Sequence, residues 1–107
     1  MSGLSNTFAA LGDPTRFAIV ERLLQDGEQP ASKLYAVANI SAPAVSRHLK
    51  VLRNAGIIKQ RIDKQRRMYS VQPEAVQAIN DWAISYRDFW QGSMDRLAAA
   101  LLQSRDH

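Results

Sequence analysis

The sequence predicts a mainly α-helical fold of about five helices with one small β-hairpin. Apolar residues recur at helical spacing through most of the chain, and glycine and proline separate the helical stretches near residues 12–14 and 27–30. An extended stretch with a polar turn occupies residues 57–71. With 107 residues, 46% of them hydrophobic, we expect residues 1–107 to form a single domain.

The first two helices are expected to be joined by a sharp turn. Leu4, Phe8 and Leu11 predict a short first helix that ends near residue 12. Asp13 is a suitable N-cap for the second helix, and Pro14 suits its first position. The predicted buried stripe of the second helix comprises Phe17, Ile19, Val20, Leu23 and Leu24.

The next two helices form the predicted helix-turn-helix. Residues 30–37 read as a short third helix that buries Leu34, and a tight turn leads to Ser41 as the N-cap of a fourth helix over residues 42–55. Its predicted core face comprises Val45, Leu49 and Leu52. Small residues near the start of its outer face would allow this helix to enter a major groove, so that its longer side chains reach base edges.

Residues 57–71 predict a strand, a turn near residues 63–65 and a second strand. The expected apolar anchors are Ile58, Ile62, Met68 and Val71. A basic hairpin directly after a recognition helix is typical of a wing, so the predicted fold is a winged helix-turn-helix with a two-stranded wing. An ordinary solvated hairpin is the alternative interpretation.

The last third of the chain predicts one long helix over residues 73–103, with a wide apolar and aromatic stripe. We expect this stripe to form a homodimer seam with the first helix, because a domain of this size cannot cover it alone. Packing within one chain and a ligand pocket remain alternatives. The predicted dimer interface comprises Leu4, Phe8, Ile79, Trp82, Tyr86, Phe89, Trp90, Leu97 and Leu101.

Charge is strongly segregated along the chain. Residues 33–67 hold nine Lys or Arg and one acid, Asp63, a net charge of +8, whereas the remaining residues hold five basic and nine acidic residues, a net of −4. A helix and a hairpin that present such charge favour double-stranded DNA as the partner. The predicted DNA-binding residues are Ser41, Pro43, Ala44, Ser46, Arg47, His48, Lys50, Lys64, Arg66, Arg67 and Tyr69.

Individual roles within this set remain open. Arg47 could read a guanine or contact a phosphate, whereas Lys50 is expected to contact a phosphate. Ser41 could be an N-cap alone, and His48 could donate to DNA or form a structural hydrogen bond. Tyr69 could steady the wing against the core or touch the DNA backbone.

Several classes of function lack support in the sequence. Without cysteine there is no disulfide and no thiolate-ligated metal, which fits a cytoplasmic protein. No apolar run is long enough to span a membrane, and the first residues do not resemble a signal peptide. No phosphate-binding glycine loop, nucleophile–base pair or metal cluster indicates an enzyme or a cofactor. A winged-helix protein-interaction module is the alternative function, but it would not explain the basic segment.

Two long motifs carry a family resemblance. Residues 8–16 (FAALGDPTR) and residues 41–52 (SAPAVSRHLKVL) resemble the opening and the recognition helix of the ArsR-type (arsenic-repressor) family of winged helix-turn-helix regulators. Residues 55–58 (AGII) and the basic hairpin resemble the segment after the recognition helix in that family. The resemblance implies a homodimer that represses transcription, often of its own operon, and leaves DNA when an effector binds. If that dimer is two-fold symmetric, we expect it to bind an inverted repeat.

The chain departs from the metal-sensing members of that family. Its third helix has no cysteine, its last helix has no histidine, and its two histidines, His48 and His107, are not expected to converge on one ion. The wing turn also lacks the glycine often found there. We therefore expect a regulator that does not respond to metals, with an unidentified organic effector as one possible means of control.

Overall fold

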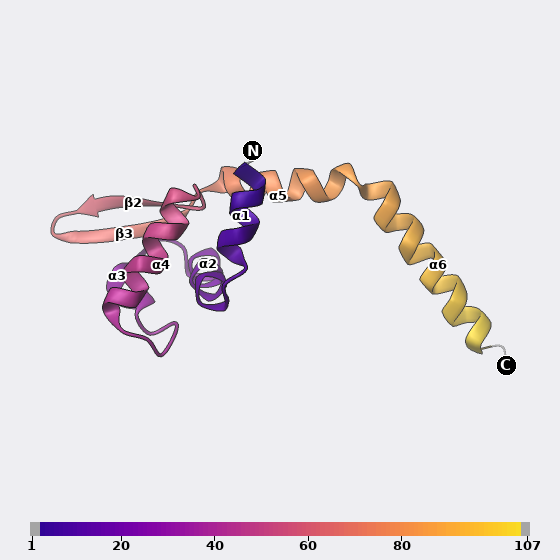
Figure 1. Cartoon of the computed structure of the whole chain (residues 1–107), viewed down its shortest axis with the longest axis horizontal. Coiled ribbons are helices and arrows are strands. Elements are labelled where there is room, and N and C mark those ends of the chain that lie inside the picture. Colours follow the sequence, from indigo (N-terminus) through magenta and orange to yellow (C-terminus); the bar gives the residue numbers. More distant parts are fainter. Residues whose placement is uncertain (1–2, 106–107) are drawn as a thin grey trace. The chain divides into compact units, whose positions relative to one another are not determined.

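The computed structural model describes residues 3–105 and contains six helices and three strands in that range. The helices are α1 (Gly3–Leu11), α2 (Pro14–Asp26), α3 (Ala31–Leu34), α4 (Ala42–Asn54), α5 (Pro73–Ser85) and α6 (Arg87–Arg105). The strands are β1 (Gln29–Pro30), β2 (Ile58–Asp63) and β3 (Arg66–Val71). The predicted mainly helical, winged helix-turn-helix fold is confirmed (Figure 1).

The chain divides into two compact units, one ending at Gln77 and the other starting at Ala78. The first unit contains α1 to α4, the whole sheet and the start of α5. The second contains the rest of α5 and α6. One domain over residues 1–107 stays a prediction.

Helix ends in the first unit follow the local sequence. The Asp13 carboxylate caps α2 by accepting from the Arg16 N–H at 3.0 Å, and Pro14 occupies the first turn, where its missing N–H leaves no bond unmade. Gly27 ends the helix with φ of 77°, a conformation that glycine adopts without strain. Both predicted ends of α2 are confirmed.

The core of the first unit joins α1, α2, α3 and α4 to the base of the sheet. Its buried members are Ala10, Ile19, Val20, Leu23, Leu34, Val45, Leu49, Leu52, Ile57, Ile58 and Tyr69. Two predicted members are wrong, because Phe17 is 48% and Leu24 56% exposed. The buried side of α2 centres on Ile19, Val20 and Leu23, so two residues seven apart on the neighbouring face point away from the core.

The sheet has one more strand than the sequence predicted. Its order is β1-β3-β2 and both pairings are antiparallel, with Gln29 opposite Tyr69 and Asp63 opposite Arg66. The expected third helix over residues 30–37 is reduced to α3. Gln29 and Pro30 pair with the base of the wing before it, and a turn follows it, in which the Val37 N–H donates to the Leu34 carbonyl at 3.1 Å. Ile62 was wrongly expected to be an apolar anchor, since it is 60% exposed near the hairpin tip.

The single long helix predicted over residues 73–103 is wrong. It ends at Ser85 and restarts at Arg87 (Figure 1). The Ser85 hydroxyl donates to the Trp82 carbonyl at 2.7 Å, which is the acceptor that the Tyr86 N–H would use in a continuous helix. The Tyr86 N–H bonds Ala83 O instead, and this carbonyl also accepts from the indole N–H of Trp90 at 3.1 Å. Side chains thus take over backbone acceptors at the break.

Candidate nucleic-acid interface

Helix α4 packs against the core with one side and exposes the opposite side to solvent. Val45, Leu49 and Leu52 are at most 2% exposed, so this side of the helix is fully packed. Ser41 is the N-cap, and its hydroxyl accepts from the Ala44 N–H at 3.3 Å. The predicted N-cap and core face of this helix are confirmed, and they fix which residues the outer side presents.

Most of the predicted DNA-contacting residues on α4 lie on its accessible side. Those that are exposed are Ser41, Pro43, Ser46, Arg47 and Lys50, whereas Ala44 and His48 are half-buried. Small or polar side chains occupy the first turn and the cations lie further along, an order suited to insertion into a groove.

His48 is held by the start of α2. Its Nδ1 atom lies 3.3 Å from Nη1 of Arg16 and 3.9 Å from Oδ2 of Asp13. The Arg16 N–H that donates to the Asp13 carboxylate lowers the pKa of Asp13, and the positive charge of Arg16 acts in the same direction. The structural hydrogen bond considered for His48 is therefore present, and only its remaining ring nitrogen is left for DNA.

The wing presents three predicted cations at its tip. Lys64, Arg66 and Arg67 are exposed, and among the described residues only Arg66 has an ion-pair partner, Asp63 at 3.9 Å. The turn at the tip requires one left-handed residue, a position where glycine is usually preferred. Lys64 takes this position with φ of 60°, and the turn therefore forms without glycine. The side chains at this tip remain accessible to a polyanion.

Tyr69 lies inside the hairpin rather than on its surface. It is 4% exposed, and its hydroxyl donates to Oε1 of Gln60 at 3.0 Å. Nη1 of Arg53 donates to the same oxygen at 2.9 Å. The burial favours the steadying role of Tyr69, and Gln60 links the end of α4 to both strands of the wing. Gln60 was not predicted from the sequence, since nothing in the local pattern signals this junction.

A second anchor of the wing was also missed. Arg61 on β2 forms a two-pronged ion pair with Glu28, with N···O distances of 2.8 and 2.6 Å. Hydrogen bonding and the charge of Arg61 lower the pKa of Glu28, and Glu28 raises the pKa of Arg61 in return. Arg61 is thus engaged with the segment before β1. Arg61 therefore stabilises the wing and also contributes to the positive charge of residues 33–67.

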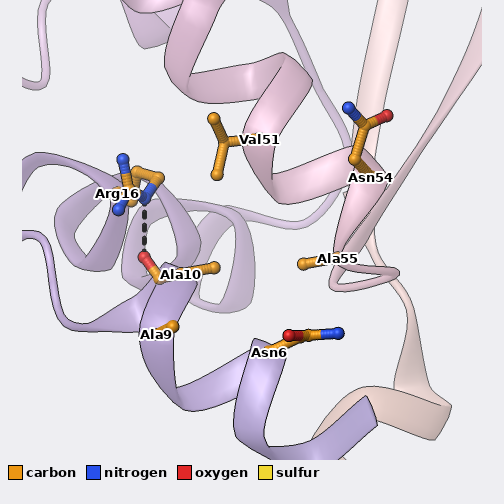
Figure 2. Close-up of a pocket in the computed structure, with 7 residues that line it drawn as sticks. All are labelled: Asn6, Ala9, Ala10, Arg16, Val51, Asn54 and Ala55. Carbon is orange, nitrogen blue, oxygen red and sulfur yellow. Dashed lines mark hydrogen bonds between the residues drawn. The ribbon is translucent and has the colours of Figure 1, made fainter. Parts of the chain in front are cut away.

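A shallow hollow of about 350 Å³ lies between α1, α2 and the second half of α4 (Figure 2). Its lining residues are Asn6, Ala9, Ala10, Arg16, Val51, Asn54 and Ala55. Arg16 stands at one edge of the hollow with its guanidinium bonded to the Ala10 carbonyl. The helices of the first unit are therefore tied together here by a polar contact in addition to the apolar core.

The apolar stripe of the second unit is exposed. Trp82, Tyr86, Phe89 and Trp90 are 41–59% exposed, as are Leu97 at 54% and Leu101 at 58%. Ile79 is half-buried. In the first unit, α1 presents Phe8 at 41% exposure and a half-buried Leu4. The predicted interface residues are therefore largely accessible in the single chain.

Two further findings concern absent features. Within residues 3–105, no three acidic or imidazole side chains lie together as a group that could hold a metal ion. His107 lies outside the described residues. Among the described helices, none is both long and apolar enough to cross a membrane.

Comparison with known proteins identifies the family. A family model described as a helix-turn-helix domain matches residues 11–61. The transcriptional repressor SdpR of Bacillus subtilis is 32% identical over 83 residues, which cover 78% of this chain and 91% of SdpR.

Solved structures share the fold. The crystal structure of an ArsR family transcriptional regulator has a TM-score of 0.73 and 27% identity, and covers 83% of this chain and 91% of its own. A homodimeric winged helix-turn-helix DNA-binding domain from Mycobacterium bovis, at 16% identity and a TM-score of 0.65, shares the fold alone and covers 84% of this chain and 83% of its own. The helix-turn-helix match, the ArsR-family structure with the same winged fold and the repressor relative converge on one assignment: this chain belongs to the ArsR-type family of winged helix-turn-helix transcriptional regulators.

Proposed function

We propose that this chain is a homodimeric repressor that binds double-stranded DNA at an inverted repeat. In this proposal α4 enters the major groove and the wing follows the sugar–phosphate backbone. The observation that carries it is the placement of exposed Arg47 and Lys50 on the outer side of a helix whose opposite side is fully packed. DNA binding accounts for the net charge of +8 in residues 33–67, whereas a protein-interaction module would not account for it.

The DNA contacts are proposed to fall into two groups. Arg47 lies early enough on α4 to reach a base edge, and Ser41, Pro43, Ala44 and Ser46 allow the first turn of the helix to approach the groove. Lys50 and the wing cations Lys64, Arg66 and Arg67 contact phosphates. Tyr69 supports the wing from within, in keeping with its burial.

Dimerisation is proposed to use the exposed stripe of α5 and α6 together with α1. A two-fold dimer would present two copies of α4 to half-sites about one helical turn, roughly 34–36 Å, apart. The homodimeric Mycobacterium bovis domain supports this assembly at the level of the fold, and the named repressor SdpR supports repression. A cytoplasmic location follows from this proposal.

Control by metals is not part of the proposal. Thiophilic ions need thiolates, which the chain lacks, and zinc needs about four convergent ligands. An organic effector that binds near the aromatic stripe, a partner protein, or the abundance of the regulator itself would then control it.

The experiment is a gel-shift titration with DNA from upstream of the protein's own gene and with random DNA, each over a range of salt concentrations. We expect preference for the specific fragment and a steep salt dependence. Replacing Arg66 and Arg67 together by Ala should weaken binding to both DNAs. The dimer would lose four phosphate contacts, two from each chain, so the salt slope should fall by about 3.6, because each contact contributes roughly 0.9.

The matched control replaces Arg22 and Arg96 by Ala, which removes the same charge from α2 and α6. An unchanged slope in the wing variant would remove the wing from the interface. Absence of salt-dependent DNA binding in the wild type would favour the interaction module instead.

A further inference from the structure

The side chain of Arg16 joins two helices that flank α2. Its Nε donates to the Ala10 carbonyl at the end of α1 at 2.7 Å, and its Nη1 lies 3.3 Å from Nδ1 of His48 on α4 (Figure 2 shows the contact with Ala10). Arg16 belongs to the motif at residues 8–16. Its position connects that motif to the recognition helix.

The hydrogen bond between Arg16 and His48 can run in only one direction. A guanidinium has five N–H donors and no acceptor, so Nδ1 of His48 must be the acceptor. In the neutral imidazole, an accepting Nδ1 leaves the proton on Nε2. Arg16 therefore selects one of the two tautomers of His48.

Asp13 does not compete for Nδ1 in this arrangement. Its Oδ2 atom is 3.9 Å from Nδ1, beyond hydrogen-bond distance, and the same oxygen accepts from the N–H of Arg16 at 3.0 Å. The carboxylate is thus held as the N-cap of α2, and its negative charge partly balances the positive charge of the adjacent guanidinium. The Nδ1–H form of His48 would face a guanidinium donor instead of an acceptor.

His48 occupies the flank of α4, between exposed Arg47 and buried Leu49, and its side chain is 23% accessible. A residue on the flank of a recognition helix faces the wall of the groove more readily than its floor. Phosphate oxygens line that wall and accept from neutral N–H groups. The Nε2–H group is the donor that the Arg16 contact leaves available.

We propose that Arg16 is a positioning residue of the DNA interface, which holds His48 in the Nε2–H form so that this group donates to a backbone phosphate. This inference rests on the proposed DNA-binding function. It assigns Arg16 a role in DNA recognition through a residue that it orients, without a contact of its own to DNA.

The tautomer is tested without DNA. The two histidines of the chain give a simple imidazole ¹⁵N spectrum, and His107→Gln leaves His48 alone. At about pH 8, where imidazole is ordinarily neutral, we expect His48 to show a single Nε2–H pattern. Arg16→Met removes the donors at similar side-chain length and should give a mixture of tautomers. An Nδ1–H pattern in the wild type, or an unchanged pattern in Arg16→Met, would overturn the inference.

The phosphate contact is tested with two His48 variants that separate its nitrogens. The amide of Asn reaches the Nδ1 position and can still accept from Arg16, whereas the amide of Gln reaches the Nε2 position and can still donate to DNA. His48→Asn should therefore keep the unfolding midpoint near that of the wild type and lose about tenfold in affinity for specific and random DNA alike. His48→Gln should bind DNA more tightly than His48→Asn although it is less stable.

A purely structural role predicts the reverse order, with DNA affinity following stability, and that result would overturn the inference while leaving the proposed function intact. Failure of the wild type to bind either DNA would instead overturn the proposed function, and the inference with it. Arg16→Met should lose affinity for both DNAs, and rescue in Arg16→Lys, which retains a donor, would support the positioning role. Wild-type affinity in Arg16→Met would contradict it.

Discussion

Two polar side chains of the predicted DNA face, His48 and Tyr69, direct hydrogen bonds inward. His48 receives one from Arg16, 32 positions away in sequence, and Tyr69 donates one to Gln60. Helical and strand periodicity placed both residues near the correct face but could not identify these partners, because such contacts depend on how distant elements pack. For both residues the sequence left the structural and the DNA-contacting role open, and the structural contact is now visible.

Arg47 is the residue on which specificity is expected to depend. It is exposed on α4, and no hydrogen bond or ion pair within the described chain engages its guanidinium. Arg47→Ala should lower affinity for the operator by about 1–3 kcal/mol if the contact to a guanine is bidentate, and should lower it much less on random DNA. Competition gel shifts with both DNAs measure the difference.

Lys50→Ala is the matched control for Arg47→Ala, since it removes an exposed cation from the same helix. Its loss of affinity should be nearly equal on both DNAs, because a phosphate contact carries no sequence information. Equal losses for Arg47→Ala as well would reduce Arg47 to a phosphate contact.

At the scale of elements, the sequence predicted α1, α2, α4 and the wing closely, because each has an apolar period, and α2 and α4 also begin at clear N-caps. It failed where side chains or short pairings override the local pattern. The Ser85 hydroxyl and the Trp90 indole divide the last helix, and the apolar stripe continues through the break without a signal. The two residues of β1 are too few to show a strand pattern.

Gln60 is expected to set the position of the wing relative to α4. Replacing it by Leu would leave the buried Tyr69 hydroxyl and the Arg53 guanidinium without their shared acceptor. We expect a loss of about 1–3 kcal/mol in the free energy of unfolding, the typical penalty for an unsatisfied buried polar group. Denaturant unfolding of Gln60→Leu measures it.

Gln60→Glu is the control, because it keeps an acceptor oxygen at the same position. This variant should unfold close to the wild type and retain DNA affinity, whereas Gln60→Leu should lose affinity as the wing becomes less well oriented. Identical stability of Gln60→Leu and the wild type would show that the shared acceptor contributes nothing.

The Glu28–Arg61 pair gives the wing a pH-dependent anchor. Because the folded-state pKa of Glu28 is lowered from its ordinary value of 4.5, the pair stabilises fully above that value, and its stabilisation is lost as the pH falls through the folded-state pKa. Glu28→Gln should therefore be less stable than the wild type at neutral pH, and the difference should vanish in acid. Thermal unfolding across this pH range measures the difference.

The lowered pKa of Asp13 contributes acid sensitivity of the same sign, but both proteins retain it, so it cancels in the comparison. Arg61→Gln provides the reciprocal variant, since it also breaks the pair. A gap between the wild type and Glu28→Gln that persisted unchanged in acid would assign the effect to packing rather than to charge.

At the scale of the whole molecule, the sequence identified two surfaces of opposite character. Charge counting located the basic segment, and the aromatic period located the apolar stripe. The structure leaves both accessible, with Arg47 and Lys50 exposed on one and Phe89 and Leu97 on the other. A polyanion matches the first surface, and burial against another apolar surface would stabilise the second.

The apolar stripe is expected to hold the two chains of the dimer together. Trp90 is 47% and Leu97 54% exposed, and fully burying a large apolar side chain is worth on the order of 1.5–3 kcal/mol. A charge placed at either position would have to be desolvated in a dimer, so Trp90→Glu and Leu97→Glu should each yield monomers in sedimentation experiments. Their operator affinity should fall because the two half-sites are no longer bound by one linked pair of α4 helices.

Ala99→Glu is the control, because it adds the same charge on the opposite side of α6, and it should remain dimeric. The Leu97 variant is the more direct test, because Trp90 also bonds the carbonyl of Ala83 at the helix break. A wild type that sediments as a monomer at micromolar concentrations, or a Leu97→Glu variant that remains dimeric, would exclude this stripe as the dimer seam.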